Sequence, residues 1–453
     1  MKSGQPRLLV ITYHFPPDPS VGGLRWAGLA KHLVRRGCEV HILTHGPKRD
    51  TRLLEGIQVH GCARARTVND IYVAVTDSLR GGQHWATQAG AAMGEVRMRG
   101  TILGELRREL ASLLAFPDHS RGWMLRAGLR ARDLARRFEV DVVVTSGPPH
   151  SAHVAGVLAT LRRPVPLLID LRDPWSEQSR AWQHDPVYGT AGAKRLTQVL
   201  ERTSFGSATT ILANTQELAE RVAQRWPQKR VHWVPNGTDL EALPTRGQKR
   251  LPGLALAYSG TLYGERSFDA VLAALARLSH THPEASVAGP YMRVAGYIDP
   301  PHAPRLQASL ERTGLTAHVV VLGRLPRREA MDLIASSRLA LVLAQEQELQ
   351  VPAKLYECVG IGTPTLVITE LDSATAREAQ RLGALVRSPS DIAGITDVLC
   401  RSWRGETFGS LPPRSVIGYS ELATEVLGLI AASGGVAGAN GRSGTAARAT
   451  SLW

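Results

Sequence analysis

Short apolar segments alternate with helical patterns along almost the whole chain, and this alternation constrains the fold more than any other feature. Most of the segments are continuous apolar runs, as expected for strands covered on both faces. Strands that alternate with helices in this way predict parallel α/β sheets. In the first half we expect strands at Leu8–Thr12, Glu39–Leu43, Val140–Thr145, Pro166–Asp170 and Thr209–Asn214.

The chain length predicts two domains, because 453 residues exceed what one hydrophobic core normally holds. A turn-rich, charged segment over 234–250 is the expected linker. We therefore expect an N-terminal α/β domain at 1–240, a second at 251–412, a helix at 413–432 and a disordered Gly/Ala/Ser/Arg-rich tail at 433–453. Strands of the second half are expected at Leu254–Ser259, Met292–Ala295, His318–Leu322, Leu339–Leu343 and Thr365–Thr369.

Residues 61–118 fit the alternation poorly and contain many arginines, so we interpret them as an insertion of helices and loops. A solvated helix over the lip of a cleft is the favoured interpretation. The alternative is a basic amphipathic segment that lies on the surface of an anionic membrane.

Charge and cysteine content narrow the classes of partner. The formal net charge of +14 attracts anions such as nucleotide phosphates or acidic lipids, although a general compositional bias explains it equally well. Aromatic residues make up only 5% and do not interleave with a basic stripe, which argues against nucleic acid. The four scattered cysteines form no CxxC pair, so we expect no zinc site and a cytoplasmic protein. We also expect no signal peptide and no membrane span.

A glycine pair, Gly22-Gly23, lies between the first strand and a helix. Glycine lets the backbone approach a phosphate or sugar closely, and a helix N-terminus favours negative charge. On its own, a glycine pair is more often a simple turn. It is neither the GxGxxG dinucleotide fingerprint nor a Walker A motif, which disfavours a dehydrogenase or a P-loop enzyme.

Two polar segments follow neighbouring strands of the first half. The first contains His150 and His153, three residues apart at the start of a helix, where they either bind a sugar or phosphate or serve in capping and packing. The second is Asp170-Leu171-Arg172-Asp173-Pro174-Trp175, whose carboxylates and indole suit sugar hydroxyls and ring faces. An internal Arg–Asp ion pair that shapes the loop is the alternative. The chain has no Asp-x-Asp pair to hold a divalent metal, so we expect no metal.

Three segments of the second half suit a nucleoside diphosphate. Arg266 follows the strand that ends at Gly260 and is placed to meet a diphosphate. Arg324 follows a later strand, in a position suited to a base edge. A helix that begins near Pro352 offers free N–H groups to phosphate, and Glu357 in its next turn can accept both hydroxyls of a ribose.

In this order, the motifs resemble those of the retaining GT-B glycosyltransferases of family 4, and of its subgroup with Pro-Pro-His-Ser and Asp-Leu-Arg-Asp-Pro-Trp. The resemblance rests on Gly22-Gly23, Pro235-Asn236-Gly237-Thr238-Asp239, Ser259-Gly260-Thr261-Leu262, Lys354-Leu355-Tyr356-Glu357 and Gly362-Thr363-Pro364. It implies two Rossmann-like domains that face each other across a cleft, with the last helix crossing back onto the first domain. It also implies metal-independent transfer, with retention, from a sugar nucleotide to a glycan, lipid-linked or small-molecule acceptor, without any other cofactor.

The resemblance also assigns roles to residues. We expect catalytic roles for His150, Asp173 and Arg266. The expected donor-binding residues are Gly22, Gly23, Gly260, Arg266, Arg324, Ala353, Lys354, Leu355 and Glu357. The expected acceptor-binding residues are His153, Asp170, Arg172 and Trp175.

The chain departs from the family pattern at three positions. By register, the family's histidine after the fourth main strand falls near Ser146, and His150 is the nearest candidate. Thr261 stands where the family usually has a basic residue, so Arg266 would act in its place. Leu349 stands where the first glutamate of the Glu-x7-Glu motif is expected, leaving Glu346, Glu348 or backbone N–H groups as substitutes. A sugar-nucleotide epimerase of similar shape and an inactive, glycosyltransferase-like partner protein therefore remain alternatives.

Overall fold

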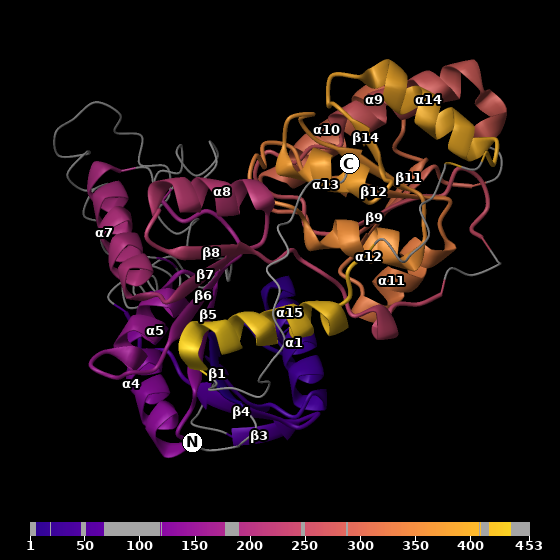
Figure 1. Cartoon of the computed structure of the whole chain (residues 1–453). Helices are drawn as coiled ribbons and strands as arrows, with labels where there is room; N and C mark the ends of the chain where they lie inside the picture. Colours follow the sequence, from indigo (N-terminus) through magenta and orange to yellow (C-terminus); the bar gives the residue numbers. More distant parts are fainter. Residues whose placement is uncertain are drawn as a thin grey trace, which may run out of the picture.

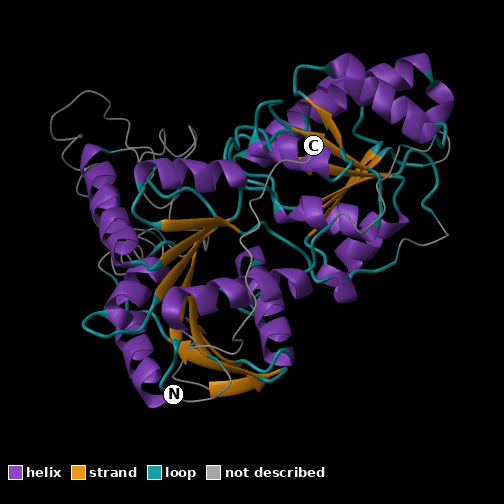
Figure 2. Ribbon diagram, viewed as in Figure 1, coloured by secondary structure: helices purple, strands orange, loops and turns teal. Residues whose placement is uncertain are grey.

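The structure is a computed structural model that describes residues 6–18, 20–46, 51–67, 118, 120–176, 190–245, 250–286, 289–406, 408 and 416–435. Two separate β-sheets, each covered by helices, lie side by side and divide the chain into an N-terminal and a C-terminal lobe (Figures 1 and 2). The first sheet ends with β8 at Trp233 and the second begins with β9 at Leu256. The expected class, α/β with two doubly wound parallel-sheet domains, is confirmed.

The N-terminal sheet has the strand order β3-β4-β2-β1-β5-β6-β7-β8, and all its pairings are parallel except β3 with β4. The order reverses between β1 and β5, so their carboxyl ends open a crevice where α/β proteins bind ligands. The strands are β1 (Arg7–Thr12), β2 (Glu39–His45), β3 (Thr51–Leu54), β4 (Ile57–Cys62), β5 (Val142–Gly147), β6 (Leu167–Leu171), β7 (Thr210–Ala213) and β8 (Arg230–Trp233). The helices are α1 (Leu24–Arg35), α4 (Arg121–Arg137), α5 (Ser151–Thr160), α7 (Ala191–Ser207) and α8 (Gln216–Arg225).

The C-terminal sheet is entirely parallel, with the order β11-β10-β9-β12-β13-β14 and a switch point between β9 and β12. Its strands are β9 (Leu256–Ser259), β10 (Met292–Ala295), β11 (Val319–Gly323), β12 (Leu339–Leu343), β13 (Thr365–Ile368) and β14 (Leu385–Arg387). Its helices are α9 (Asp269–Thr281), α10 (His302–Thr313), α11 (Arg327–Ser336), α12 (Ala353–Ile361), α13 (Ala374–Arg381) and α14 (Ile392–Trp403).

The last helix, α15 (Tyr419–Ile430), lies against α1 of the N-terminal lobe (Figure 1). Its buried face, Leu422, Val426 and Ile430, joins the core that lies under α1 and β1. Gly28 on α1 allows the close approach, because a Cβ there would stand 2.0 Å from the ring of Tyr419. The last helix therefore packs on the N-terminal lobe, although it follows the C-terminal lobe in the chain.

The proposed insertion at 61–118 needs one correction, because Gly61 and Cys62 belong to β4 and not to an inserted segment. β3 and β4 form an antiparallel hairpin whose turn, Glu55-Gly56, has positive φ at both residues. Polar residues such as His60 interrupt the apolar pattern, yet His60 is buried against His41. Residues 68–117, and with them the expected helix at Leu103 to Leu114, lie outside the described residues, as does the tail beyond Gly435. No described helix has the length and apolar character needed to span a bilayer.

Candidate functional site

The glycine loop after β1 is held by the segment that follows β6. Gly23 ends a short 3-10 turn, and a Cβ at this position would lie 2.9 Å from the Cα of Phe15, so the backbone approach requires glycine. The Arg172 guanidinium donates to the carbonyl oxygen of Gly22 at 2.8 Å and also to that of Pro148. Arg172, which follows β6, therefore ties together the segments that follow β1 and β5.

The Asp170 carboxylate is fully buried and engaged entirely within the N-terminal lobe. It accepts hydrogen bonds from the Arg25 Nε at 3.2 Å, the Trp26 Nε1 at 2.7 Å and the Ser146 Oγ at 2.8 Å. Arg25 also donates to the carbonyl oxygens of Val234 at 3.0 Å and Pro235. The expectation that Asp170 contacts an acceptor is therefore wrong, because its oxygens have no access to a ligand. The alternative, an internal ion pair, is correct, but with Arg25 as the partner.

His150 and His153 occupy the start of α5, where the sequence placed them. The rings of His150 and Trp175 stack with centroids 4.8 Å apart, and both residues are buried. Burial lowers the pKa of each histidine to about 3, so both rings are neutral near pH 7. The His150 Nδ1 has no hydrogen-bond partner among the described residues, whereas the His153 Nδ1 contacts the Thr145 Oγ1 at 2.9 Å.

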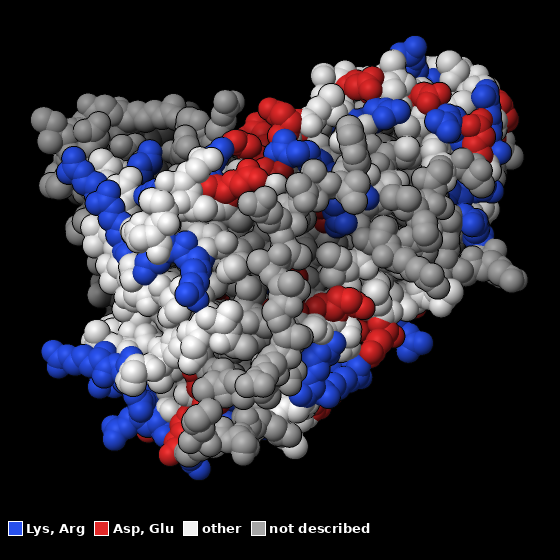
Figure 3. All heavy atoms as spheres, in the orientation of Figure 1, with Lys and Arg blue, Asp and Glu red and all other residues white. Residues whose placement is uncertain are grey.

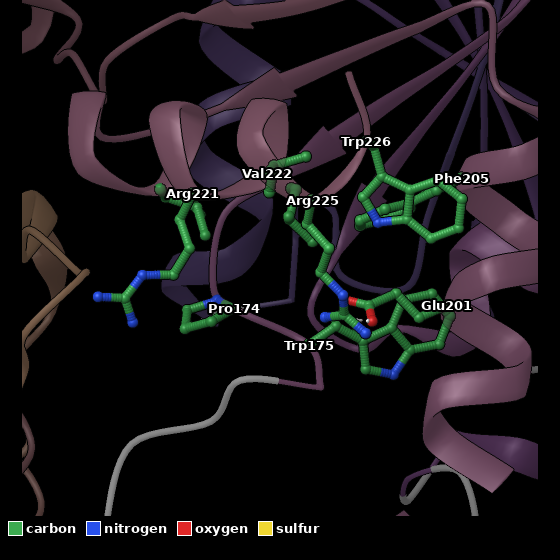
Figure 4. Close-up of a pocket in the computed structure, with 10 residues that line it drawn as sticks. Pro174, Trp175, Glu201, Phe205, Arg221, Val222, Arg225 and Trp226 are labelled. Atoms are coloured by element: carbon green, nitrogen blue, oxygen red, sulfur yellow. Dashed lines mark ion pairs between the residues drawn. The ribbon is translucent and has the colours of Figure 1, made fainter. Parts of the chain in front are cut away.

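Trp175 also lines a small pocket between the end of β6 and α8 (Figure 4). Phe205 and Trp226 supply its other aromatic walls, and Arg225 forms an ion pair with Glu201 at 3.0 Å inside it. The Trp175 indole is 3% exposed and therefore acts as packing between His150 and this pocket rather than as an open platform. This position makes direct stacking on a sugar ring unfavourable in the present conformation.

Asp173 lies where the two lobes meet. Burial raises the pKa of its carboxyl above the ordinary value, while the charge of Arg172, a hydrogen bond from the Gln350 side chain and the charge of Arg266 act against that rise. Arg172 belongs to the N-terminal lobe, and Gln350 and Arg266 belong to the C-terminal lobe. Asp173 therefore lies within electrostatic reach of Arg266, a second predicted catalytic residue, which belongs to the opposite lobe.

Arg266 lies at the end of β9, beside the Gly260-Thr261 turn. Its Nη1 donates to the Thr261 carbonyl oxygen at 3.2 Å, and its guanidinium covers the Tyr263 ring at 4.4 Å. The Arg266 Nε is buried and has no partner among the described residues, which leaves one donor for a ligand. Gly260 and Gly296 make this turn tight, because a Cβ on Gly296 would stand 1.7 Å from the Gly260 carbonyl oxygen.

The first turn of α12 carries the other predicted donor-binding residues. Pro352 precedes the helix, and the described structure has no side-chain cap on its first N–H groups. Glu357 is 3% exposed and pairs with the Arg327 Nη1 at 2.6 Å and the Lys354 Nζ at 3.0 Å. These cations outweigh the effect of burial and lower the pKa of Glu357, so its carboxylate is charged. A free helix N-terminus beside Lys354 can bind a phosphate group.

Arg324 is not part of this group in the structure. It is exposed at the end of β11, the outer strand of the sheet, and its guanidinium lies over the Tyr297 ring at 4.6 Å. A contact between Arg324 and a nucleotide base stays a prediction.

The loop between β12 and α12 makes a contact between the two lobes that the sequence did not predict. Leu349, which replaces the expected glutamate, packs into the N-terminal core beside Leu218, and its carbonyl oxygen accepts from the Thr215 Oγ1 at 2.9 Å. The Val351 carbonyl oxygen accepts from the Asn236 Nδ2 at 3.2 Å.

The two glutamates considered as substitutes, Glu346 and Glu348, are both exposed. Glu348 forms an ion pair with Arg221 at 3.0 Å, and the backbone N–H of Glu346 donates to the Glu370 carboxylate at 3.0 Å. Leu349 therefore makes an apolar contact between the lobes at the position where the resemblance implied a glutamate.

One group of potential metal ligands occurs in the described structure, namely His32, Asp239 and Glu241. The two carboxylates pair with the Lys31 Nζ at 2.8 and 3.0 Å, and Glu241 also pairs with Arg35. These cations already neutralise the carboxylates, so the group is an ion-pair network at the end of α1.

Comparisons with known proteins agree with this geometry. Residues 21–242 match the model of Glycosyltransferase Family 4. The chain is a GT-B glycosyltransferase. The match runs from the 3-10 turn η1 (Val21–Gly23) to the 3-10 turn η2 (Leu240–Ala242), and it includes the glycine pair and the Asp170–Trp175 segment. No curated protein sequence matches the chain.

Several solved structures share the glycosyltransferase's fold at low sequence identity. HepE from Anabaena, in complex with UDP and glucose, has a TM-score of 0.61 at 12% identity, over 94% of this chain and 100% of that one. Sucrose-phosphate synthase from Thermosynechococcus elongatus has a TM-score of 0.60 at 11% identity, over 95% and 96%. A UDP-forming trehalose-phosphate synthase from Burkholderia xenovorans, in complex with glucose-6-phosphate, has 0.57 at 13%, over 94% and 96%.

Proposed function

We propose that this glycosyltransferase moves a sugar from a nucleoside-diphosphate donor to an acceptor hydroxyl, with retention and without a metal ion. The C-terminal lobe would bind the donor and the N-terminal lobe the acceptor. The observation that carries the proposal is the uncapped start of α12 beside Lys354 and the buried Glu357. A helix start that can bind phosphate and a carboxylate that can accept hydrogen bonds from a ribose thereby lie one helical turn apart.

The site offers charge stabilisation where the reaction would create charge. The bond between the anomeric carbon and the diphosphate oxygen breaks, and negative charge grows on the diphosphate. The N–H groups of Ala353 and Lys354, the Lys354 ammonium and the Arg266 guanidinium would stabilise that charge, whereas the Leu355 N–H already donates to the Pro352 carbonyl oxygen at 3.0 Å. Such stabilisation usually lowers the barrier more than any other effect in catalysis of this kind. The acceptor oxygen forms the new bond, and its proton goes to the departing phosphate oxygen.

Residues of the N-terminal lobe would orient the acceptor. His150 is neutral, because its pKa is about 3, so its free Nδ1 would exchange hydrogen bonds with a hydroxyl rather than form an ion pair. Asp173 faces the C-terminal lobe and would accept from a sugar hydroxyl. Arg172 would act by holding Gly22 in place.

The choice of substrate can be approached through the structural neighbours. The Anabaena structure holds UDP and glucose, and the Burkholderia enzyme is described as UDP-forming with bound glucose-6-phosphate. We propose UDP-sugars as the first donors to test. For the acceptor we propose a glycan, a lipid-linked sugar or a small sugar phosphate, used in the cytoplasm or at the inner face of a membrane.

The test is a calorimetric titration of UDP into the wild-type chain and into Glu357→Ala and Arg266→Ala variants. Both variants should bind at least tenfold more weakly, because each loses a charge-assisted contact. Arg277→Ala, an exposed position on α9, is the matched control and should bind as wild type. Unchanged affinity in both site variants would overturn the donor assignment.

Metal independence has its own test. Turnover in the presence of a chelator should equal turnover without it. A loss of activity that added Mg²⁺ or Mn²⁺ restores would refute that part of the proposal.

The alternative of an inactive partner rests on Leu349, because its side chain cannot replace the first glutamate of the motif. Incubation with a UDP-sugar separates the two cases. An active transferase should release free UDP slowly even without an acceptor, and a protein that binds UDP without any release fits the alternative.

A further inference from the structure

Three helices form one outer layer of the N-terminal lobe. α5 packs between α4 and α7, and their inner faces cover the core on one side of the sheet (Figure 1). We call the outward side of this layer, together with the turn at Leu161 and Arg162 that follows α5, the outer face. It takes no part in the site described above.

The outer face is strongly basic. Its only exposed acidic residue among those described is Asp133, whose charge is paired with Arg130 at 2.9 Å. Glu139, just past the end of α4, pairs with Arg7 at 3.4 Å. In Figure 3, Lys and Arg side chains line the left edge of the molecule, where Figure 1 places α7 and α4. The exposed cations are Arg126, Arg132, Arg136, Arg137, Arg162, Lys194, Arg195 and Arg202.

Large apolar side chains project from the same face. Leu125 and Leu129 lie one turn apart on α4 and are 59% and 69% exposed. Leu161 and Val199 are also exposed, on the neighbouring elements. A single exposed leucine is ordinary on a protein surface. Leucines that project between arginines are instead typical of a helix that lies in a membrane interface.

We propose that the outer face docks on a bilayer that contains anionic lipids. The arginines and lysines would bind the headgroups, and Leu125 and Leu129 would enter the acyl boundary. A nucleic acid would satisfy the charge but would leave the leucines in water, and the outer face offers no exposed aromatic ring for stacking among the described residues of α4, α5 and α7. The apolar and basic patterns together therefore favour lipid.

The position of the outer face also bears on the kind of acceptor, an inference that rests on the proposed function. Asp118, just before α4, accepts from the Ser151 N–H at 2.9 Å and from the Ser151 Oγ at 2.7 Å. The start of α4, with Leu125, is thereby tied to the start of α5, next to His150. A docked enzyme would hold the acceptor side of its site near the bilayer, which suits a lipid-linked acceptor.

The test is co-sedimentation of the full chain with phosphatidylcholine vesicles, with and without phosphatidylglycerol, at low and high salt. Wild type should bind only the anionic vesicles, and salt should weaken the binding. Arg132→Gln/Arg136→Gln should reduce partitioning about 25-fold, at roughly fivefold per cation. Leu125→Ser/Leu129→Ser should reduce it at least tenfold, roughly the scale expected from burying apolar side chains.

Matched controls come from the C-terminal lobe. Leu371→Ser, at an exposed leucine, and Arg277→Gln/Arg404→Gln, at exposed arginines, should bind vesicles as wild type. Circular dichroism melting curves should be the same for all variants, because every substituted side chain is exposed.

Three outcomes would overturn the proposal. They are no binding to anionic vesicles, wild-type binding by the leucine variant, or tighter binding to a DNA duplex that depends on the arginines and not on the leucines. Donor hydrolysis, measured without vesicles, tests the proposed function separately. Hydrolysis without vesicle binding would remove only the docking face, and vesicle binding without hydrolysis would remove only the proposed function.

Discussion

Two charged clusters in this glycosyltransferase use similar residues but differ in whether their buried polar atoms all have hydrogen-bond partners. Around Asp170, every nearby donor comes from the same lobe and the carboxylate is fully buried. Around Asp173, the partners come from both lobes, and Arg266 keeps a buried donor without a partner among the described residues. The comparison separates a cluster whose hydrogen bonds are complete from one with a buried donor left over, although Asp170, on β6, is only three residues from Asp173, which follows that strand.

The largest effect should follow Asp170→Ala. The substitution leaves Arg25 as a buried charge without its partner, and breaking such a pair typically costs about 3–5 kcal/mol. Chemical denaturation should show the loss as a lower free energy of unfolding. Asp173→Ala is the matched comparison and should unfold close to wild type, and equal destabilisation of both variants would remove the distinction between the clusters.

Arg266→Ala should lower turnover on the order of 10²–10³, the loss typical when one donor to a developing negative charge is removed. Its melting temperature should remain near that of wild type, because the Arg266 guanidinium interacts mainly with nearby residues of its own lobe, the Thr261 carbonyl, the Tyr263 ring and the Tyr258 side chain. Initial rates with saturating donor test the predicted loss of turnover, and a melting curve tests the predicted melting temperature. Full activity in this variant would contradict the assignment.

Acid should destabilise the N-terminal lobe before it affects the carboxylates. Burial lowers the pKa of His60 to about 4 and that of His150 and His153 to about 3, against 6.5 for an unperturbed histidine. The unfolded chain therefore binds more protons than the folded chain in this range. The free energy of unfolding consequently falls as the pH drops from 6.5 toward those values. Melting temperatures across this range should decrease by several degrees, and His60→Phe should make the decrease shallower.

The smallest effect should follow Arg221→Ala at the rim between the lobes. Its ion pair with Glu348 joins two exposed side chains, and such pairs contribute about 0–1 kcal/mol. Leu349→Ala, at the neighbouring apolar contact, should cost more, about 2–5 kcal/mol for a buried leucine. Denaturation curves of the two variants compare charge with packing at one interface, and a larger loss for Arg221→Ala would reverse the interpretation.

Strand ends and helix starts could be predicted from the sequence because they depend on local patterns. Val142–Val144 and Leu167–Ile169 are continuous apolar runs, and the polar residues at the ends of these strands, such as Ser146 and Asp170, pair at one edge of the sheet. The start of α12 was likewise predicted from Pro352. These features need no knowledge of distant residues.

The partners of individual side chains could not be predicted, because they come from distant parts of the chain. Arg25 and Trp26 lie on α1, and nothing local indicates that they bind Asp170. Leu349 was interpreted only as a missing glutamate, since its apolar contact in the other lobe appears only in three dimensions. Positive φ at Glu55 and Gly56 marks a hairpin that the apolar pattern did not indicate.

The loop at 345–351 joins two tasks that are usually separate. It leads directly into the helix whose start faces the proposed phosphate, and its backbone carbonyl oxygens are fastened to Thr215 and Asn236 in the other lobe. Any rotation of one lobe against the other must break or carry these bonds. The start of α12 is therefore mechanically coupled to the N-terminal lobe, and separating the lobes would distort the proposed phosphate site.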